Sequence, residues 1–236
     1  MKPVAIFRHS SIEGPGYIAE FLDRHAVPRQ LVRVDQGDAV PADAAQFSGL
    51  VFMGGPMSVN DDLPWLEPTL KLIRQAVGRD IPVMGHCLGG QLMAKALGGV
   101  VAKNPVKEIG WGEVTVIPGE TASAWLGDMC SFDGFHWHGE TFSLPSGAVP
   151  LLSSRYCANQ GFALGKHLGL QCHVEMTEAM IRSWCENGAN ELAASADSPG
   201  VQSAATMQAE MATRLPQLHA AADRLYACWL QGIAQE

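Results

Sequence analysis

The sequence has no long apolar run, no run of lysine or arginine and no closely paired cysteines. A helix that spans a membrane needs about 18 or more consecutive apolar residues, so we expect no membrane span. Acidic residues outnumber basic ones by 24 to 16, giving a formal charge of −8, which argues against nucleic acid or an anionic membrane surface as the main partner. With 47% hydrophobic residues and neither repeats nor low-complexity tracts, the chain is long enough to bury a core of its own.

The six cysteines are scattered over 236 residues without CxxC spacing. This distribution predicts neither a disulfide framework nor a zinc site, so we expect reduced thiols. The chain opens directly on the strand-like residues 4–8, instead of the longer apolar core and small-residue cleavage site of a signal peptide. These features predict a cytoplasmic protein.

Short apolar runs alternate with amphipathic helical patterns over the first hundred residues. Strands are expected at 4–8, 31–34, 49–53 and 81–84, and helices at 17–25, 66–77 and 91–97. This alternation predicts an α/β fold, with a mostly parallel, doubly wound sheet and helices on both faces. Later segments at 112–117, 149–153 and 162–165 are short, lie between Gly/Pro turns, and predict an antiparallel extension of the sheet.

The end of the chain is rich in alanine, leucine and methionine. We predict a helix at 177–187, a linker of small residues at 188–200, and one or two helices after it that are interrupted near Pro216. The expected organisation is one domain over 1–187, with a helical extension at 188–236 packed on it. A lid, a dimer face and an outer layer on the sheet are all compatible with this extension.

The segment Gly85-His86-Cys87-Leu88-Gly89 separates a predicted buried strand from a predicted helix. Small residues on both sides of Cys87 allow the sharp turn of a nucleophile elbow, and the start of the helix would stabilise a thiolate. A structural cysteine in a glycine-rich connection is the alternative, because free cysteine packs as a small apolar residue. Cys87 is therefore a candidate nucleophile.

Two other segments could complete such a site. His173 and Glu175 stand two residues apart in an extended segment, so their side chains can share one face, as a general base and its orienting carboxylate do. An ordinary satisfied His–Glu pair is the alternative. Gly54-Gly55-Pro56 follows a predicted strand and leaves backbone N–H groups at the carboxyl edge of the sheet, where they can serve as oxyanion donors or simply form a turn.

Two patterns suggest other chemistry. Gly14-Pro15-Gly16-Tyr17-Ile18-Ala19, with Asp35 downstream, matches a dinucleotide fingerprint, but five residues separate it from the preceding strand, which favours a plain loop into a helix. His136 and His138 form an H-x-H pair that could ligate a metal if a third ligand converged. Since no H-E-x-x-H or cysteine cluster accompanies them, we expect loop histidines with satisfied hydrogen bonds and no metal.

The motifs between Gly49 and Glu175 together resemble the class I (triad) glutamine amidotransferases, especially free-standing members related to the glutaminase domain of GMP synthase. The likeness is carried by the segments Met53-Gly54-Gly55-Pro56, Gly85-His86-Cys87-Leu88-Gly89-Gly90-Gln91, Trp137-His138-Gly139 and Gly169-Leu170-Gln171-Cys172-His173-Val174-Glu175. The family commonly has Phe and Pro where this chain has Cys172 and Val174.

The resemblance implies a role for each residue that matches these motifs. Cys87 would be the nucleophile, His173 the general base and acid, and Glu175 the orienting carboxylate. The backbone N–H groups of Gly55 and Leu88 would form the oxyanion hole, and the substrate contacts would come from Gln91, Gly54 and His138. No cofactor is implied.

The implied reaction is hydrolysis of the glutamine side-chain amide to glutamate and ammonia through a γ-glutamyl thioester. Nothing in the chain resembles a synthetase domain, so an ammonia acceptor would lie on a separate subunit or not exist. Two alternatives stay open: a γ-glutamyl peptidase, hydrolase or transferase that acts on γ-glutamyl amides or peptides, and a weakly active regulatory or partner-binding subunit.

Overall fold

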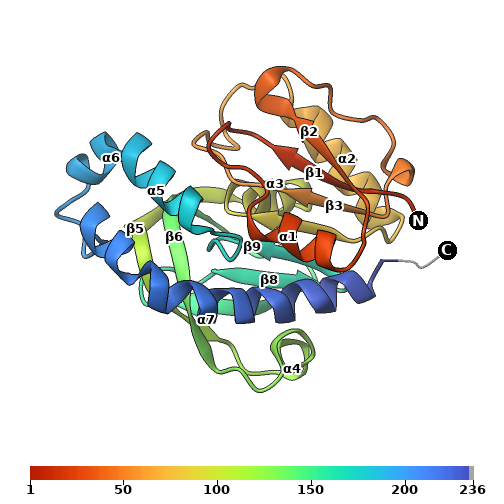
Figure 1. Cartoon of the computed structure of the whole chain (residues 1–236). Helices are drawn as coiled ribbons and strands as arrows, with labels where there is room; N and C mark the ends of the chain where they lie inside the picture. Colours follow the sequence, from red (N-terminus) through yellow and green to blue (C-terminus); the bar gives the residue numbers. More distant parts are fainter. Residues whose placement is uncertain (234–236) are drawn as a thin grey trace.

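The computed structural model describes residues 1–233, and within them a ten-stranded sheet forms the centre of the molecule (Figure 1). Its strands are β1 Val4–Arg8, β2 Arg29–Arg33, β3 Gly49–Phe52, β4 Val83–His86, β5 Val101–Val116, β6 Ser131–Phe142, β7 Val149–Ser154, β8 Gly161–Leu164, β9 His167–Leu170 and β10 Gly200–Val201. The order across the sheet is β10-β5-β7-β8-β9-β4-β3-β1-β2, with β6 paired to β5.

Strands β2, β1, β3, β4 and β9 run parallel to one another, whereas β9, β8, β7 and β5 pair antiparallel, as do β5 and β6. The helices are α1 Tyr17–Arg24, α2 Leu66–Gly78, α3 Leu88–Ala96, α4 Glu120–Leu126, α5 Glu178–Asn187, α6 Ala189–Ala194 and α7 Ala204–Gln231, with short 3₁₀ turns at Val34–Gln36 and Ala44–Gln46. This architecture confirms the predicted parallel α/β sheet with an antiparallel extension.

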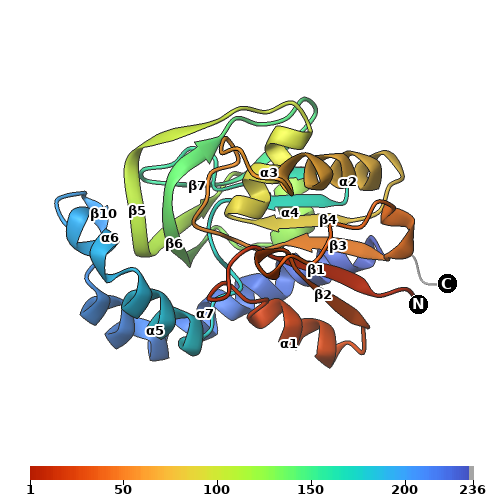
Figure 2. The ribbon, with the colours of Figure 1, turned by 90° about the horizontal axis from the view of Figure 1, so that it is seen from above.

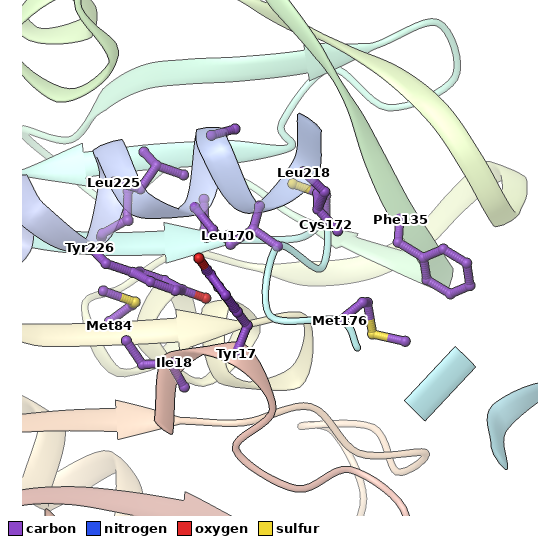
Figure 3. Close-up of a cluster of buried hydrophobic side chains, with 14 of the residues drawn as sticks. Tyr17, Ile18, Met84, Phe135, Leu170, Cys172, Met176, Leu218, Leu225 and Tyr226 are labelled. Atoms are coloured by element: carbon purple, nitrogen blue, oxygen red, sulfur yellow. The ribbon is translucent and has the colours of Figure 1, made fainter. Parts of the chain in front are cut away.

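The sheet separates two hydrophobic cores, one on each face. Alternate residues of β1 point to opposite cores, Val4 and Ile6 to one and Ala5 and Phe7 to the other, as the period of two in a strand requires. Helices α2 and α3 cover one face, while α1, α5 and α7 cover the other (Figure 2). Figure 3 shows the core under α1, α5 and α7, where Tyr226 of α7 and Tyr17 of α1 meet residues of β4 and β9.

The C-terminal region differs from the prediction. Helix α7 continues through Pro216 without interruption, because its apolar stripe, which includes the fully buried Leu218 and Leu225, is held against the sheet. Pro216 itself is exposed, as is Ala212, so water can bond to the carbonyl that the proline leaves unpaired. The predicted linker at 188–200 contains α6 and ends in β10, which pairs with β5. Residues 234–236 of the predicted extension lie outside the described residues.

His136 and His138 were expected in a loop, but both lie on strand β6. Glycines and charged residues at 133–140 concealed an edge strand whose long pairing with β5 supplies the hydrogen bonds that local propensity does not. Among the helices that the structure describes, none is long and apolar enough to cross a membrane.

Candidate active site

Cys87 occupies the turn between β4 and α3, with a left-handed φ of 49° that non-glycine residues seldom adopt. Its amide donates to the Leu170 carbonyl at 2.9 Å, and its carbonyl accepts from the Gln91 amide at 3.0 Å. A Cβ added at Gly85 would collide with the Gly89 carbonyl, so strand and helix can approach this closely only because residue 85 has no side chain. The predicted elbow geometry is therefore present around a 7% exposed thiol.

His173 lies past the end of β9 and is held by an isolated bridge to Phe135 of β6, in which its amide donates to the Phe135 carbonyl at 2.8 Å. The extended segment predicted here is shorter than expected, because regular pairing of β9 stops at Leu170. The ring of His173 stands edge-on to Trp184 of α5, and its Nδ1 lies 2.7 Å from Glu175 Oε1. Glu175 thus fixes one ring nitrogen as a donor and leaves Nε2 for another group.

The charges of this pair stabilise each other. Burial alone would lower the pKa of His173, but Glu175 and Cys87 outweigh burial and hold that pKa well above its usual value. Burial would likewise raise the pKa of Glu175, yet His86 and His173 lower it to about 2. Within residues 1–233, His173 Nε2 has no hydrogen bond of ordinary geometry, although Cys87 is close enough to act on the pKa of the ring. Such a loose contact is common before substrate binds.

A second buried layer, which the sequence did not predict, lies next to Glu175. His86 Nε2 is 3.8 Å from Glu175 Oε2 and forms a 3.1 Å hydrogen bond with the hydroxyl of Tyr226, from α7. Both residues are fully buried. The sequence did not indicate that Tyr226 would lie near Glu175, because Tyr226 is part of an alanine-rich helix without a motif.

The loop between β1 and α1 folds over the His173–Glu175 pair. The amide of Tyr17 donates to the Glu175 carbonyl at 2.8 Å, and Trp184 Nε1 donates to the Ile12 carbonyl at 2.8 Å. Gly16, with φ 53°, packs so closely on Glu175 that an added Cβ would strike its carbonyl. Asp35, the candidate ribose ligand of the nucleotide fingerprint, instead accepts two hydrogen bonds from Arg8. Gly16 therefore lets this loop lie against the pair.

Cys87 and His173 open on a cavity of about 830 Å³. Of the residues predicted to contact substrate, Gln91 and His138 line this cavity, as does Gly55 of the predicted oxyanion hole. Gly54 lies beside the His173 ring, and Leu88 begins α3 directly after Cys87. The remaining lining residues come from the β1–α1 loop, the β3–α2 loop, the start of β5, β6 and the α5–α6 corner; they include Glu13, Met57, Lys103, Lys107, Trp137, Glu140, Trp184 and Glu191.

Gln91 and Cys87 are linked through a residue that sequence reasoning missed. Gln91 Nε2 donates to Gln171 Oε1 at 3.2 Å, and Gln171 Nε2 lies 3.5 Å from Cys87 Sγ. The Trp137 carbonyl of β6 is 3.9 Å from the same sulfur. Gln171 belongs to the segment 169–175 that carries the family resemblance, and its place two positions before His173 was the only available signal for it.

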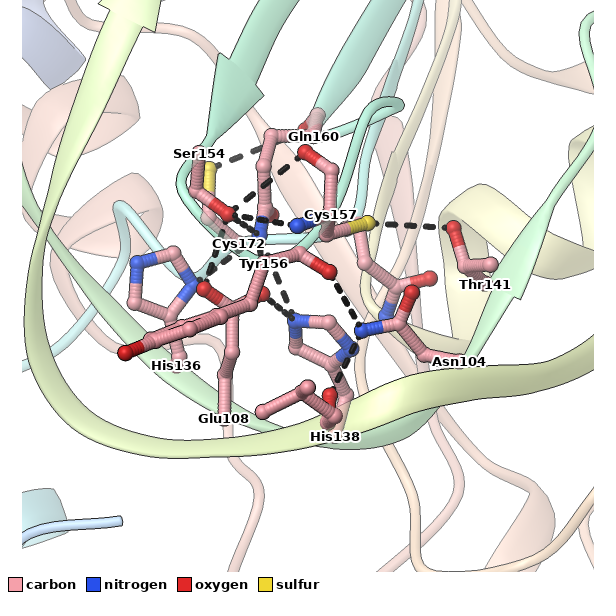
Figure 4. Close-up of polar contacts among 12 residues, drawn as sticks. Asn104, Glu108, His136, His138, Thr141, Ser154, Tyr156, Cys157, Gln160 and Cys172 are labelled. Carbon is pink, nitrogen blue, oxygen red and sulfur yellow. Dashed lines mark hydrogen bonds and ion pairs between the residues drawn. The ribbon is translucent and has the colours of Figure 1, made fainter. Parts of the chain in front are cut away.

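Glu108, His136 and His138 form the one cluster among the described residues with the donor types of a metal site (Figure 4). His138 Nε2 lies 3.2 Å from Glu108 Oε2, while its Nδ1 bonds to the Glu140 carbonyl at 3.0 Å. Gln160 Nε2 lies among the three side chains, 2.9 Å from Glu108 Oε2 and 3.3 Å from a ring nitrogen of each histidine. The side-chain nitrogen of Gln160 thus already contacts all three candidate ligands.

Three buried histidines make the stability of the fold sensitive to acid. Burial lowers the pKa of His9, His136 and His167 to about 4, from 6.5. Below pH 6.5 the unfolded chain therefore binds protons that the folded chain does not, and each ring removes about 1.4 kcal/mol of stability per pH unit. Burial raises the pKa of Glu13 from 4.5 to about 7, which opposes this loss with one proton. We expect the free energy of unfolding in urea to be lower at pH 5 than at pH 6.5.

The Glu13→Gln variant supplies the control, because it removes the opposing proton on Glu13 and should steepen the loss. An unfolding free energy at pH 5 equal to or above that at pH 6.5 would contradict this account of the three histidines.

Comparison with known proteins identifies the class to which this fold and site belong. The sequence matches the family described as "Glutamine amidotransferase class-I" over residues 18–187, so the chain belongs to this family. It is similar to the protein named "Putative glutamine amidotransferase-like protein YfeJ" of Salmonella typhimurium, with 31% identity over 85% of this chain and 87% of that protein.

Solved structures and a longer relative agree with this placement. A glutamine amidotransferase from Methylobacillus flagellatus has a TM-score of 0.96 and 45% identity, with 100% of this chain and 97% of that chain covered. One from Thermotoga maritima has a TM-score of 0.87 and 26% identity, with 98% of both chains covered. GMP synthase of Vibrio campbellii is 32% identical over 59% of this chain, but only 27% of that enzyme is covered. The resemblance to free-standing amidotransferases and to the GMP synthase glutaminase region is confirmed, and it supports a glutamine amidotransferase-like function.

Proposed function

We propose that the chain hydrolyses the side-chain amide of glutamine through a γ-glutamyl thioester on Cys87. One observation carries this proposal: Cys87, on a strained turn, and His173, which is hydrogen-bonded to Glu175, open on the same cavity. A thiol, an imidazole beside it and an orienting carboxylate are the groups that nucleophilic amide hydrolysis requires.

In the first half of the reaction, Cys87 Sγ bonds to the amide carbon after its proton has passed to His173. His173 returns that proton to the nitrogen and the C–N bond breaks. Ammonia departs, and Cys87 is left as a γ-glutamyl thioester. Water then adds to the thioester as His173 takes its proton, and the C–S bond breaks to release glutamate and the thiol. The amides of Gly55 and Leu88 would bind the oxyanion, each donor being worth about 2.7–4 kcal/mol in the transition state.

The proposal is tested by measuring ammonia and glutamate released from glutamine in the steady state, and by mass spectrometry of protein quenched in acid during turnover. We expect equal amounts of the two products and a γ-glutamyl adduct on the peptide that contains Cys87. If no glutamyl compound is turned over and a γ-glutamyl chloroketone fails to label Cys87, the chain is instead a regulatory or partner-binding subunit.

The size of the cavity favours a second candidate, hydrolysis or transfer of γ-glutamyl groups from peptides or amines. At about 830 Å³ it lies in the upper part of the range that holds drug-sized ligands, far more than glutamine fills. A higher kcat/KM for γ-glutamyl peptides or amides than for glutamine would select this activity.

Because GMP synthases are among the relatives, a separate synthetase subunit is our proposed acceptor of ammonia in the glutaminase case. Stimulation of glutamine hydrolysis by a cell extract would support such a partner. An unchanged rate would count against it.

A further inference from the structure

Glu13 places a carboxylate in the cavity that neither the family motifs nor the triad accounts for. Its loop is fixed on both sides, by the hydrogen bond from Trp184 to the Ile12 carbonyl and by the bond from Tyr17 to the Glu175 carbonyl. The Glu13 amide also donates to the Ser10 carbonyl at 3.1 Å, which closes a turn in front of it. This side chain is therefore carried by an anchored segment.

The carboxylate faces His173. A Cβ added at Gly54 would strike Glu13 Oε2 and would lie 3.2 Å from His173 Cε1, so the carboxylate and the ring both lie against the same glycine. Burial raises the pKa of Glu13 to about 7, with His173 acting to lower it and Glu175 to raise it. Within residues 1–233 the side chain of Glu13 makes no hydrogen bond or ion pair. A carboxylate kept partly from water without a partner is costly unless a ligand supplies one.

The position of Glu13 indicates which part of a substrate it meets. In the proposed reaction His173 hands its proton to the departing nitrogen, so the leaving amine must lie against the His173 ring. Glu13, Ile12 and Trp184 line the cavity around that ring. The carboxylate is consequently placed beside the amine of the scissile amide.

We infer that Glu13 is a specificity residue that binds a cationic group on the leaving amine, so that the preferred substrates are γ-glutamyl amides of amines that carry a second, protonated amino group. This inference rests on the proposed function and names its substrate class. The second amine completes the ion pair that Glu13 lacks, and the space in the cavity accommodates its carbon chain. Glu191 provides the control, because it is also a carboxylate that lines the cavity but already has partners: it accepts hydrogen bonds from Lys107 at 2.7 Å and from Trp137 at 2.9 Å.

The test compares two amides of similar length, γ-glutamyl-(4-aminobutyl)amide and γ-glutamyl-pentylamide, as substrates of the parent protein, Glu13→Gln and Glu191→Gln. We expect the parent to prefer the aminobutyl amide by tenfold or more in kcat/KM. Glu13→Gln should lose this preference, mainly through KM, while Glu191→Gln keeps it. Equal kcat/KM values for the two amides in the parent, or an equal loss on both amides in Glu13→Gln, would overturn the inference.

Binding without turnover separates this inference from the proposed reaction. Calorimetry with 1,4-diaminobutane as the probe should detect binding to the parent and to Glu191→Gln, and at least tenfold weaker binding to Glu13→Gln. If no amide is hydrolysed but this pattern of binding is found, the reaction is wrong and the cation site stands. If amides are hydrolysed but the diamine binds the parent and Glu13→Gln equally, the cation site is wrong and the reaction stands.

Discussion

Replacement of Cys87 by alanine is expected to lower the release of ammonia from glutamine by at least about 10⁴-fold, because the remaining groups can orient the amide but cannot form the thioester. Alanine tolerates the left-handed turn about as well as cysteine does, so the fold should be retained. Initial rates at saturating glutamine, with a melting curve for each protein, measure both effects.

Cys130→Ala is the matched control for the loss of a thiol, since Cys130 is exposed and lies outside the cavity. It should leave the rate at the parent value. A folded Cys87→Ala protein that turned over glutamine at a rate near that of the parent would remove Cys87 from the mechanism and the thioester with it.

The substitution Gly89→Ala is expected to destabilise the fold by about 3 kcal/mol or more. An added Cβ would strike the carbonyl oxygen of Phe52 and lie 2.7 Å from its carbon, and a strand backbone cannot rotate away as a side chain can. Because Gly89 follows Cys87 in the elbow, the same shift should also abolish activity. Urea denaturation of both proteins gives the change in unfolding free energy.

Gly78→Ala serves as the control, because Gly78 is also a helical glycine but has nothing within 4 Å of an added Cβ. There, alanine should be neutral or stabilise by up to about 1 kcal/mol, through the higher helix propensity of alanine and the lower entropy of the unfolded chain. Equal stabilities for the two variants would show that close contact at Gly89 does not constrain the elbow.

The elbow and the parallel sheet could be predicted because local sequence determines them. Buried parallel strands form continuous apolar runs, and the glycine at position 85 is required by its contact with Gly89 in the same strand–turn–helix unit. Pairing of His173 with Glu175 was predictable for the same reason, since they stand two positions apart in the chain. In both cases the residues that interact are close to one another in the sequence.

The features that the sequence did not reveal depend on tertiary contacts. Glu13 resembles any polar loop residue until the fold brings its loop onto Glu175, and Gln160 becomes part of a network only when the residue before β8 lies against β5 and β6. Strand β6 was mistaken for a loop because its pairing with β5, not its composition, makes it a strand. Helix α7 passes Pro216 because burial of its apolar stripe outweighs one lost hydrogen bond.

The bond between Tyr226 and His86 ties α7 to the His173–Glu175 pair, on the face of the sheet that α1 and α5 also cover. A truncated protein that lacked α7 would lose Tyr226, and with it the hydrogen bond to His86 next to Glu175. If this helix were exchanged for that of another amidotransferase, the new helix would therefore need a hydroxyl at the position of Tyr226. Without it, His86 would lose its hydrogen bond beside the carboxylate that orients His173.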